Sequence, residues 1–121
     1  MSDLIYKYWG KAKKNEDGGM PDYHLLVYHC LDVAAVGWIL INPKKPLCKK
    51  ITKSLGVKPS WLRDFFVFCL ALHDLGKFSR SFQGLRTDLS TNLVKANPRM
   101  NYSERHDSLG FWLWRLHNSR F

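Results

Sequence analysis

Three stretches of the chain place apolar residues at the three- and four-residue spacing of an amphipathic helix. The pattern predicts long helices over about 23–41 and 61–74, and a last helix that follows Ser103-Glu104 and runs to His117. Residues that favour helix ends support these limits: Asp22, Ser60 and Ser103 as N-caps, and Asn42-Pro43 and Gly76 as terminators. No persuasive strand pair, internal repeat or low-complexity tract is visible. The sequence therefore predicts one all-α domain.

Polar segments connect these helices. Residues 1–21 form a polar, turn-rich N-terminal segment, 43–60 form a basic connection with one short helix over 47–55, and 84–102 form a loop. Residues 77–83 have the pattern of one or two further helical turns.

The net charge of the chain suggests a binding partner. The 121 residues carry 19 Lys and Arg against 10 Asp and Glu, a net charge of +9, which favours a polyanion such as nucleic acid. The candidate contacts are Lys44, Lys45, Lys49, Lys50 and Arg80. A solvated loop is the simpler interpretation of the lysines in 43–60.

Cysteine usage and hydropathy indicate a cytoplasmic protein without a membrane segment. The three cysteines are odd in number and show no C-x-x-C spacing, which suggests a reducing compartment. No apolar signal-peptide core follows the N-terminus. The longest apolar run, 33–41, is far shorter than the ~20 residues needed to span a bilayer.

The pair His73-Asp74, set in the stretch 65–78 at the point where its apolar run ends, is the main candidate for chemistry. Buried imidazole and carboxylate groups are costly without partners, and a divalent metal would satisfy both. Together with His29 and His106, which lie in other predicted helices, the pair could hold one or two metal ions. Lys77, three residues after Asp74, could neutralise a phosphate. Taken singly, His29 also fits a core histidine, and His106 and Lys77 fit surface residues.

The sequences and the order of several motifs resemble those of a known family. The motifs are Tyr8-Trp9-Gly10-Lys11, Tyr28-His29-Cys30-Leu31-Asp32-Val33-Ala34, and Ala71-Leu72-His73-Asp74-Leu75-Gly76-Lys77-Phe78 with Phe82-Gln83. Together they resemble the HD nuclease domain at the N-terminus of the helicase-nuclease recruited by Cascade in type I CRISPR systems, with the I-E subtype nearest. The resemblance extends from about Tyr6 to Trp114.

The resemblance implies an HD-superfamily helical fold and metal-dependent cleavage of single-stranded DNA in antiviral defence. It implies that His29, His73, Asp74 and His106 are metal ligands, with Asp74 bridging, and that Lys77 lies near the scissile phosphate. The implied cofactors are one or two transition-metal ions, Mn, Co, Ni, Fe or Zn. The implied partners are single-stranded DNA, Cascade and a helicase portion.

The domains of this family contain residues that have no counterpart in this chain. Family domains are about twice as long, and their later ligands, a His-His pair and a final Asp, have no match here. We therefore expect a truncated HD domain whose nuclease activity is weak or absent when it is alone.

Two alternatives to a nuclease stay open. One is a non-catalytic fragment that binds Cascade, a complementary half or itself, because residues 110–121 form an aromatic helix that is apolar around most of its circumference. The other is an HD-type phosphohydrolase that acts on nucleotides.

Overall fold

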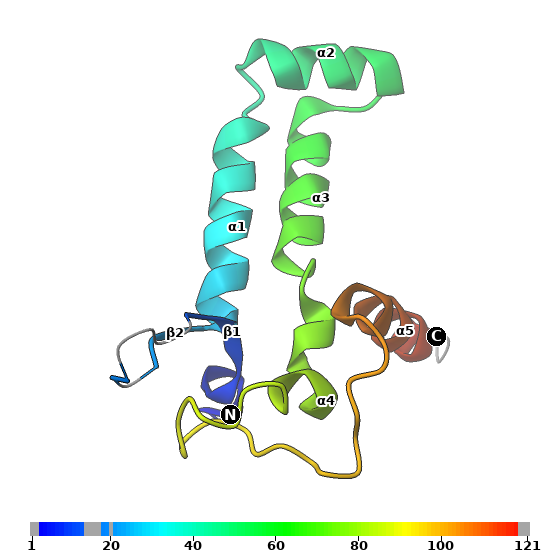
Figure 1. The fold of residues 1–121 in the computed structure, drawn as a ribbon. Helices are drawn as coiled ribbons and strands as arrows, with labels where there is room; N and C mark the ends of the chain where they lie inside the picture. Colours follow the sequence, from blue (N-terminus) through cyan, green and yellow to red (C-terminus); the bar gives the residue numbers. More distant parts are fainter. Residues whose placement is uncertain (1–2, 14–17, 20, 119–121) are drawn as a thin grey trace. The chain divides into compact units, whose positions relative to one another are not determined.

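The structure is a computed structural model that describes residues 3–13, 18–19 and 21–118. Its elements follow in the order η1, β1, β2, α1, α2, α3, η2, α4 and α5, where η denotes a 3-10 helix (Figure 1). The chain divides into two compact units, a first unit of residues 1–29 and 74–121 and a second unit of residues 30–73. Parts of the predicted terminal segments, at 1–2, 14–17, 20 and 119–121, lie outside the described residues.

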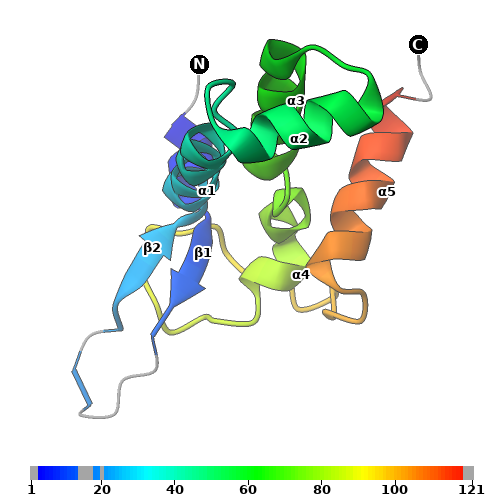
Figure 2. The same cartoon turned by 90° about the horizontal axis from the view of Figure 1, so that it is seen from above.

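The first unit begins with η1 (Asp3–Lys7) and contains a strand pair that the sequence pattern did not predict. Strands β1 (Trp9–Ala12) and β2 (Tyr23–Leu25) are antiparallel, and their register shifts between Trp9 and Lys11 (Figure 2). The predicted helix over 23–41 is therefore wrong at its start, and so is its cap at Asp22. Tyr23 and Leu25 pack against the core of the first unit, so their apolar character belongs to the strand. In the described residues all other elements are helices, which confirms the all-α class.

The core of the first unit joins segments that are far apart in the chain. Its buried members are Trp9, Phe82, Leu89 and Leu93. The side chain of Gln83, 2% exposed, accepts from the Trp9 N–H at 3.0 Å and donates to the carbonyl oxygens of Trp9 at 3.0 Å and Lys77 at 2.8 Å. Each of these buried groups would cost about 1–3 kcal/mol if left without a partner. Gln83 therefore fixes β1 against the segment that follows residue 74.

Short helices and a loop complete the first unit. They are η2 (Leu75–Phe78), α4 (Arg80–Gln83), the predicted loop over 84–102 and α5 (His106–Asn118). The predicted N-cap at Ser103 is wrong, because α5 begins at His106 and the His106 N–H donates to the Tyr102 hydroxyl at 2.8 Å. An aromatic side chain from the loop thus replaces the expected serine at the start of this helix.

The second unit consists of helices. It holds most of α1 (Leu26–Leu40), together with α2 (Pro46–Leu55) and α3 (Pro59–Ala71), and α1 and α3 run side by side (Figure 1). Its buried cluster contains Ile41, Cys48 and Leu62. The short helix predicted over 47–55 is confirmed as α2. The cap predicted at Ser60 is wrong, because α3 begins at Pro59, a residue whose fixed φ suits the first turn of a helix.

The end of α3 places the His73-Asp74 pair outside a helix. The sequence predicted helix to Asp74 and a stop at Gly76, but α3 ends at Ala71. The Leu72 N–H contacts the carbonyl oxygens of Phe68 and Cys69, and the His73 N–H contacts that of Leu70. The bonds to Cys69 and Leu70, three positions back, tighten the last turn, so that His73 and Asp74 lie in the connection to η2.

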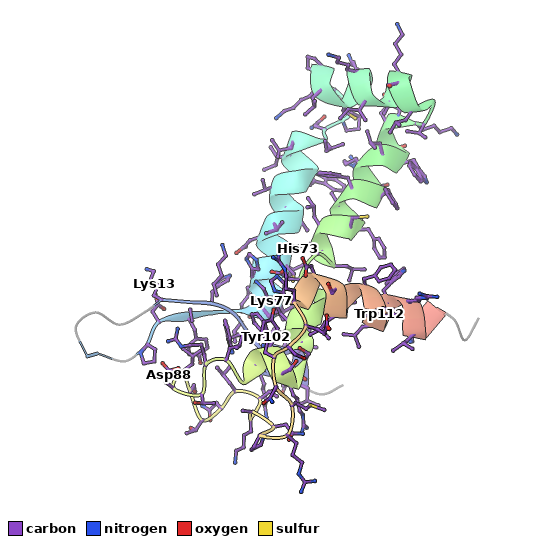
Figure 3. All side chains as sticks on the ribbon, turned by 45° about the vertical axis from the view of Figure 1, so that its right-hand side comes forward. Lys13, His73, Lys77, Asp88, Tyr102 and Trp112 are labelled. Atoms are coloured by element: carbon purple, nitrogen blue, oxygen red, sulfur yellow. The ribbon has the colours of Figure 1, made fainter. Side chains whose placement is uncertain are left out.

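Apolar side chains on α5 are exposed to an unusual degree. Phe111, Trp112, Leu113, Trp114 and Leu116 are each between 44% and 64% exposed, and the side chain of Trp112 extends outward from the helix (Figure 3). Within the described part of the chain, no helix is long and apolar enough to cross a membrane.

Candidate metal centre

Asp74 is the centre of the candidate site. It is 4% exposed, and its backbone carbonyl accepts from the Lys77 N–H at 2.9 Å, which starts η2. Because a buried carboxylate needs positive or hydrogen-bonding partners, the groups around its two oxygens define the chemistry available here. Three side chains of the first unit provide these partners, from α1, η2 and α5.

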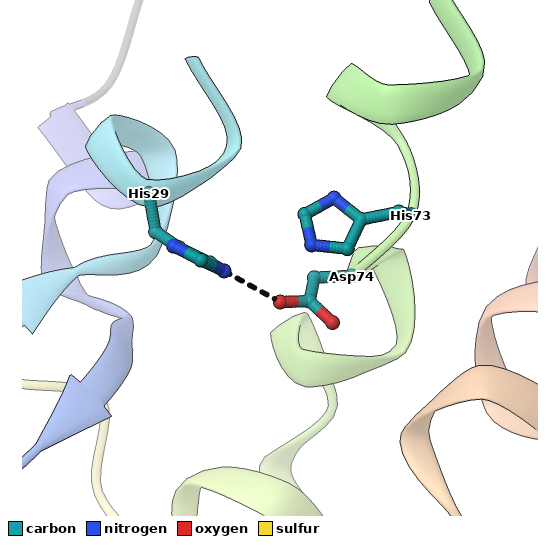
Figure 4. A group of neighbouring side chains, drawn as sticks. All are labelled: His29, His73 and Asp74. Atoms are coloured by element: carbon teal, nitrogen blue, oxygen red, sulfur yellow. Dashed lines mark ion pairs between the residues drawn. The ribbon is translucent and has the colours of Figure 1, made fainter. Parts of the chain in front are cut away.

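His29 reaches Asp74 from the first turn of α1. Its Nε2 lies 3.1 Å from Asp74 Oδ2, as Figure 4 shows. Helix α1 is anchored by the Leu26 N–H, which donates to the Tyr8 carbonyl oxygen at 2.8 Å. Gly10 permits this close packing, because a Cβ there would lie 2.9 Å from the Leu26 Cα and 3.3 Å from the His29 Cβ. The glycine of β1 thus brings the strand and the histidine together.

His106 reaches the other oxygen from the first residue of α5. Its Nε2 lies 3.4 Å from Asp74 Oδ1. Two glycines make this approach possible, since a Cβ on Gly76 would overlap the His106 carbonyl oxygen and a Cβ on Gly110 would lie 3.1 Å from the Gly76 nitrogen. Backbone therefore packs directly on backbone where η2 meets α5. Gly76 was predicted to terminate a helix, but in the structure it packs directly against the backbone of α5.

Lys77 is the cationic partner of Asp74. Its Nζ lies 2.7 Å from Asp74 Oδ2 and donates to the Gly10 carbonyl oxygen at 3.3 Å. The ammonium also lies 5.5 Å from the centre of the Phe82 ring, a cation–π contact. These contacts hold Lys77 against the carboxylate, where its charge offsets that of Asp74.

His73 directly precedes Asp74 in the chain. Its Nδ1 lies 2.6 Å from the Leu70 carbonyl oxygen, which can only accept, so Nδ1 carries a proton. In the neutral ring the lone pair is then on Nε2, the form that binds a metal. One ligand atom each from His29, His73 and Asp74 lies within 4.8 Å of the others (Figure 4).

The distances around Asp74 fit metal coordination. Two ligand atoms about 2.1 Å from one ion are separated by about 3.0 Å in octahedral and about 3.4 Å in tetrahedral geometry. The imidazole nitrogens of His29 and His106 lie 3.1 Å and 3.4 Å from the two oxygens of Asp74. Nitrogen and carboxylate ligands together suit borderline transition metals. The residues therefore fit an ion beside each oxygen of Asp74.

The second His-Asp pair of the sequence differs from the first. Asp107 is exposed, and the Ser108 N–H and the Arg105 side chain lower the pKa of its carboxyl group. It contacts Arg105 at 3.2 Å and the Ser108 N–H at 2.9 Å, at the start of α5. Asp107 therefore stabilises the start of a helix, where a negative charge is favourable.

The predicted nucleic-acid contacts fall in both units. Lys44 and Lys45 precede α2, while Lys49 and Lys50 lie on it, and all four are surface residues of the second unit. Arg80 belongs to the first unit and lines a hollow of about 840 Å³ together with Lys7 and Lys95. Among the described residues, none that lines this hollow is acidic. Lys7 and Lys95 were not among the sequence candidates.

Two further residues of the site were missed by sequence reasoning. Gly10 and Tyr102 contact the candidate histidines or Lys77. Gly10 lay within the family-like motif Tyr8-Trp9-Gly10-Lys11, which gave a signal. Tyr102 lay in a segment that resembled only a loop.

The family model described as "Cas3, HD domain" matches residues 9–120. The chain is 36% identical over 97 residues to the CRISPR-associated endonuclease/helicase Cas3 of Escherichia coli (strain K12). That match covers 80% of this chain and 11% of the relative, so the chain spans about a tenth of the relative's length. No solved structure matches the chain.

Proposed function

Because the chain belongs to the Cas3 HD-domain family, we propose that it is a metal-dependent nuclease domain that cleaves single-stranded DNA. The observation that carries this proposal is the buried carboxylate of Asp74, with an imidazole nitrogen on each oxygen and an ammonium beside it. The name of the Escherichia coli relative, an endonuclease and helicase, supports the same reaction class.

The chain's own residues would divide the work between binding metal and binding phosphate. His29, His73 and Asp74 would hold one ion, and Asp74 and His106 would hold a second, of Mn, Co, Ni, Fe or Zn. Bound divalent ions lower the pKa of water and stabilise the charge of a phosphoryl transition state. Asp74 would bridge the two positions, because each of its oxygens faces a different histidine.

Lys77 is proposed to contact the scissile phosphate. In the structure its ammonium is held by Asp74 and the Gly10 carbonyl oxygen. With Asp74 engaged as a metal ligand, the Lys77 ammonium would be held less tightly by the carboxylate and would be available to a phosphate oxygen.

The charge distribution supports a DNA substrate. The net charge of +9 favours association with a polyanion, and the hollow lined by Lys7, Arg80 and Lys95 is a surface where backbone phosphates could bind. Lys44, Lys45, Lys49 and Lys50 remain secondary candidates for such contacts. In this proposal the chain acts in the cytoplasm in CRISPR antiviral defence, with Cascade and a helicase portion as its partners.

Incubation with circular single-stranded DNA tests the reaction, because a circle has no ends for an exonuclease. We expect Mn²⁺, Co²⁺ or Ni²⁺ to support degradation by the wild-type chain and not by the His73→Ala, Asp74→Ala double variant. Equal degradation by the two proteins would reject the proposal. Hydrolysis of nucleoside phosphates with no effect on DNA would instead favour a nucleotide phosphohydrolase.

The exposed face of α5 favours a second candidate function, a binding surface for another polypeptide. The five large apolar side chains of α5 described above are on average about half exposed. A helix that faces only solvent does not normally expose so many large apolar side chains. We expect the isolated chain to self-associate through this face, and Trp112→Glu with Leu116→Glu to yield a monomer in light scattering. A wild-type monomer that binds no hydrophobic dye would exclude this function.

A further inference from the structure

One hydroxyl group contacts His106 twice. The Tyr102 oxygen lies 2.8 Å from the His106 backbone nitrogen and 3.1 Å from the His106 Nδ1. The opposite ring nitrogen, Nε2, lies 3.4 Å from Asp74 Oδ1. The imidazole is therefore held between the tyrosine hydroxyl and the central carboxylate, and Tyr102 lies beside the start of α5 (Figure 3).

The hydrogen-bonding capacity of the hydroxyl allows two states. A tyrosine hydroxyl has one proton and two lone pairs, and one lone pair is taken because the backbone N–H of His106 can only donate. In the first state, the hydroxyl donates its proton to Nδ1, and Nε2 carries the ring proton toward Asp74. In the second, the hydroxyl accepts from a protonated Nδ1, and Nε2 presents its lone pair toward Asp74. The second state is the one a metal ligand requires.

Packing holds the two rings in place independently of these bonds. The Phe82 ring packs edge-on against Tyr102 at 5.7 Å and against His106 at 5.5 Å, measured between ring centres. Removing the Tyr102 hydroxyl should therefore leave the rings positioned and change only their hydrogen bonding.

We propose that Tyr102 is a positioning residue for His106, whose hydroxyl donates to Nδ1 without metal and accepts from Nδ1 when Nε2 binds metal. The metal-bound half of this proposal rests on the proposed function, whereas the metal-free half does not. The hydroxyl stays in contact with the ring in both states, so the ring need not reorient when an ion enters.

Nitrogen-15 NMR of the histidine rings tests the metal-free half, at a pH where His106 is neutral. In the wild type we expect a proton on Nε2 and an Nδ1 resonance typical of a hydrogen-bond acceptor. Tyr102→Phe should move the Nδ1 resonance, whereas Tyr28→Phe, which removes the hydroxyl of an exposed tyrosine of α1, should not. An Nδ1 resonance that does not respond to Tyr102→Phe would overturn the proposal.

Titration with Zn²⁺, followed by calorimetry and the same NMR signals, tests the metal-bound half. We expect the His106 proton to move to Nδ1 in the wild type, and Tyr102→Phe to weaken the binding of Zn²⁺ at His106 about 10–100-fold. A purely structural cap would lower the melting temperature and leave the Zn²⁺ affinity unchanged, which would also overturn the proposal. If Zn²⁺ does not perturb wild-type His106, the proposed metal site fails, and the metal-free spectra alone decide the role of Tyr102.

Discussion

Asp74→Asn is expected to abolish metal binding and to reduce nuclease activity by at least about 100-fold, since even residues that support metal ligands contribute 10–100-fold. Asparagine has nearly the shape of aspartate but lacks the charge that faces two imidazoles and the Lys77 ammonium. The substitution should also destabilise the fold by about 3 kcal/mol, because it leaves the largely buried Lys77 charge without its anion. Calorimetric titration with Mn²⁺ and thermal unfolding measure the two effects.

A second substitution separates the loss of charge from the loss of stability. Lys77→Met in the Asp74→Asn background removes the uncompensated ammonium, so we expect stability to return while metal binding does not. Asp107→Asn is the matched control, because it changes the aspartate of the other, exposed His-Asp pair and should preserve metal binding. Wild-type Mn²⁺ affinity in Asp74→Asn would contradict the proposed role of Asp74.

Gly76→Ala is expected to cost about 1–3 kcal/mol and about 100-fold in activity, although it changes no ligand. The added methyl group would overlap the His106 carbonyl oxygen and lie 2.7 Å from the Gly110 nitrogen. These are backbone atoms of α5 and cannot rotate away, so the start of the helix must shift. His106 would then move away from Asp74, which it now approaches at 3.4 Å.

Gly19→Ala is the control for this prediction, because no atom of the described residues lies within 4 Å of a Cβ at that position. It should leave melting temperature and activity unchanged. The His106 ring signals in NMR would report whether Gly76→Ala displaces the histidine itself. Full activity in Gly76→Ala would show that close packing of η2 on α5 is not needed for the site.

The sequence identified the side chains that lie around Asp74 better than it identified the backbone that holds them. His29, Asp74, Lys77 and His106 were recognisable because the chemistry depends on residue type and the motifs are local. The three helices were recognisable because apolar periodicity extends over several turns. The family resemblance is confirmed by the match over residues 9–120.

The features that bring these side chains together depend on contacts between distant residues. Strands of four and three residues are too short to show a recognisable alternation of apolar and polar residues. Strand β1 is also held in place by Gln83, which lies 74 residues after Trp9 in the chain. The role of Gly76 depends on backbone that comes thirty residues later. Tyr102 resembled an ordinary loop residue because side-chain capping by an aromatic hydroxyl has no sequence signature.

Metal content per chain tests the central claim most directly. The wild-type chain and a His29→Gln, His106→Gln double variant should be loaded with Mn²⁺, desalted and compared by elemental analysis, with a circular dichroism spectrum to verify folding. We predict one or two ions per wild-type chain and a clear loss in the variant, since each substitution removes an imidazole from one oxygen of Asp74. A wild-type chain that is folded and retains no more Mn²⁺ than the variant would contradict the account.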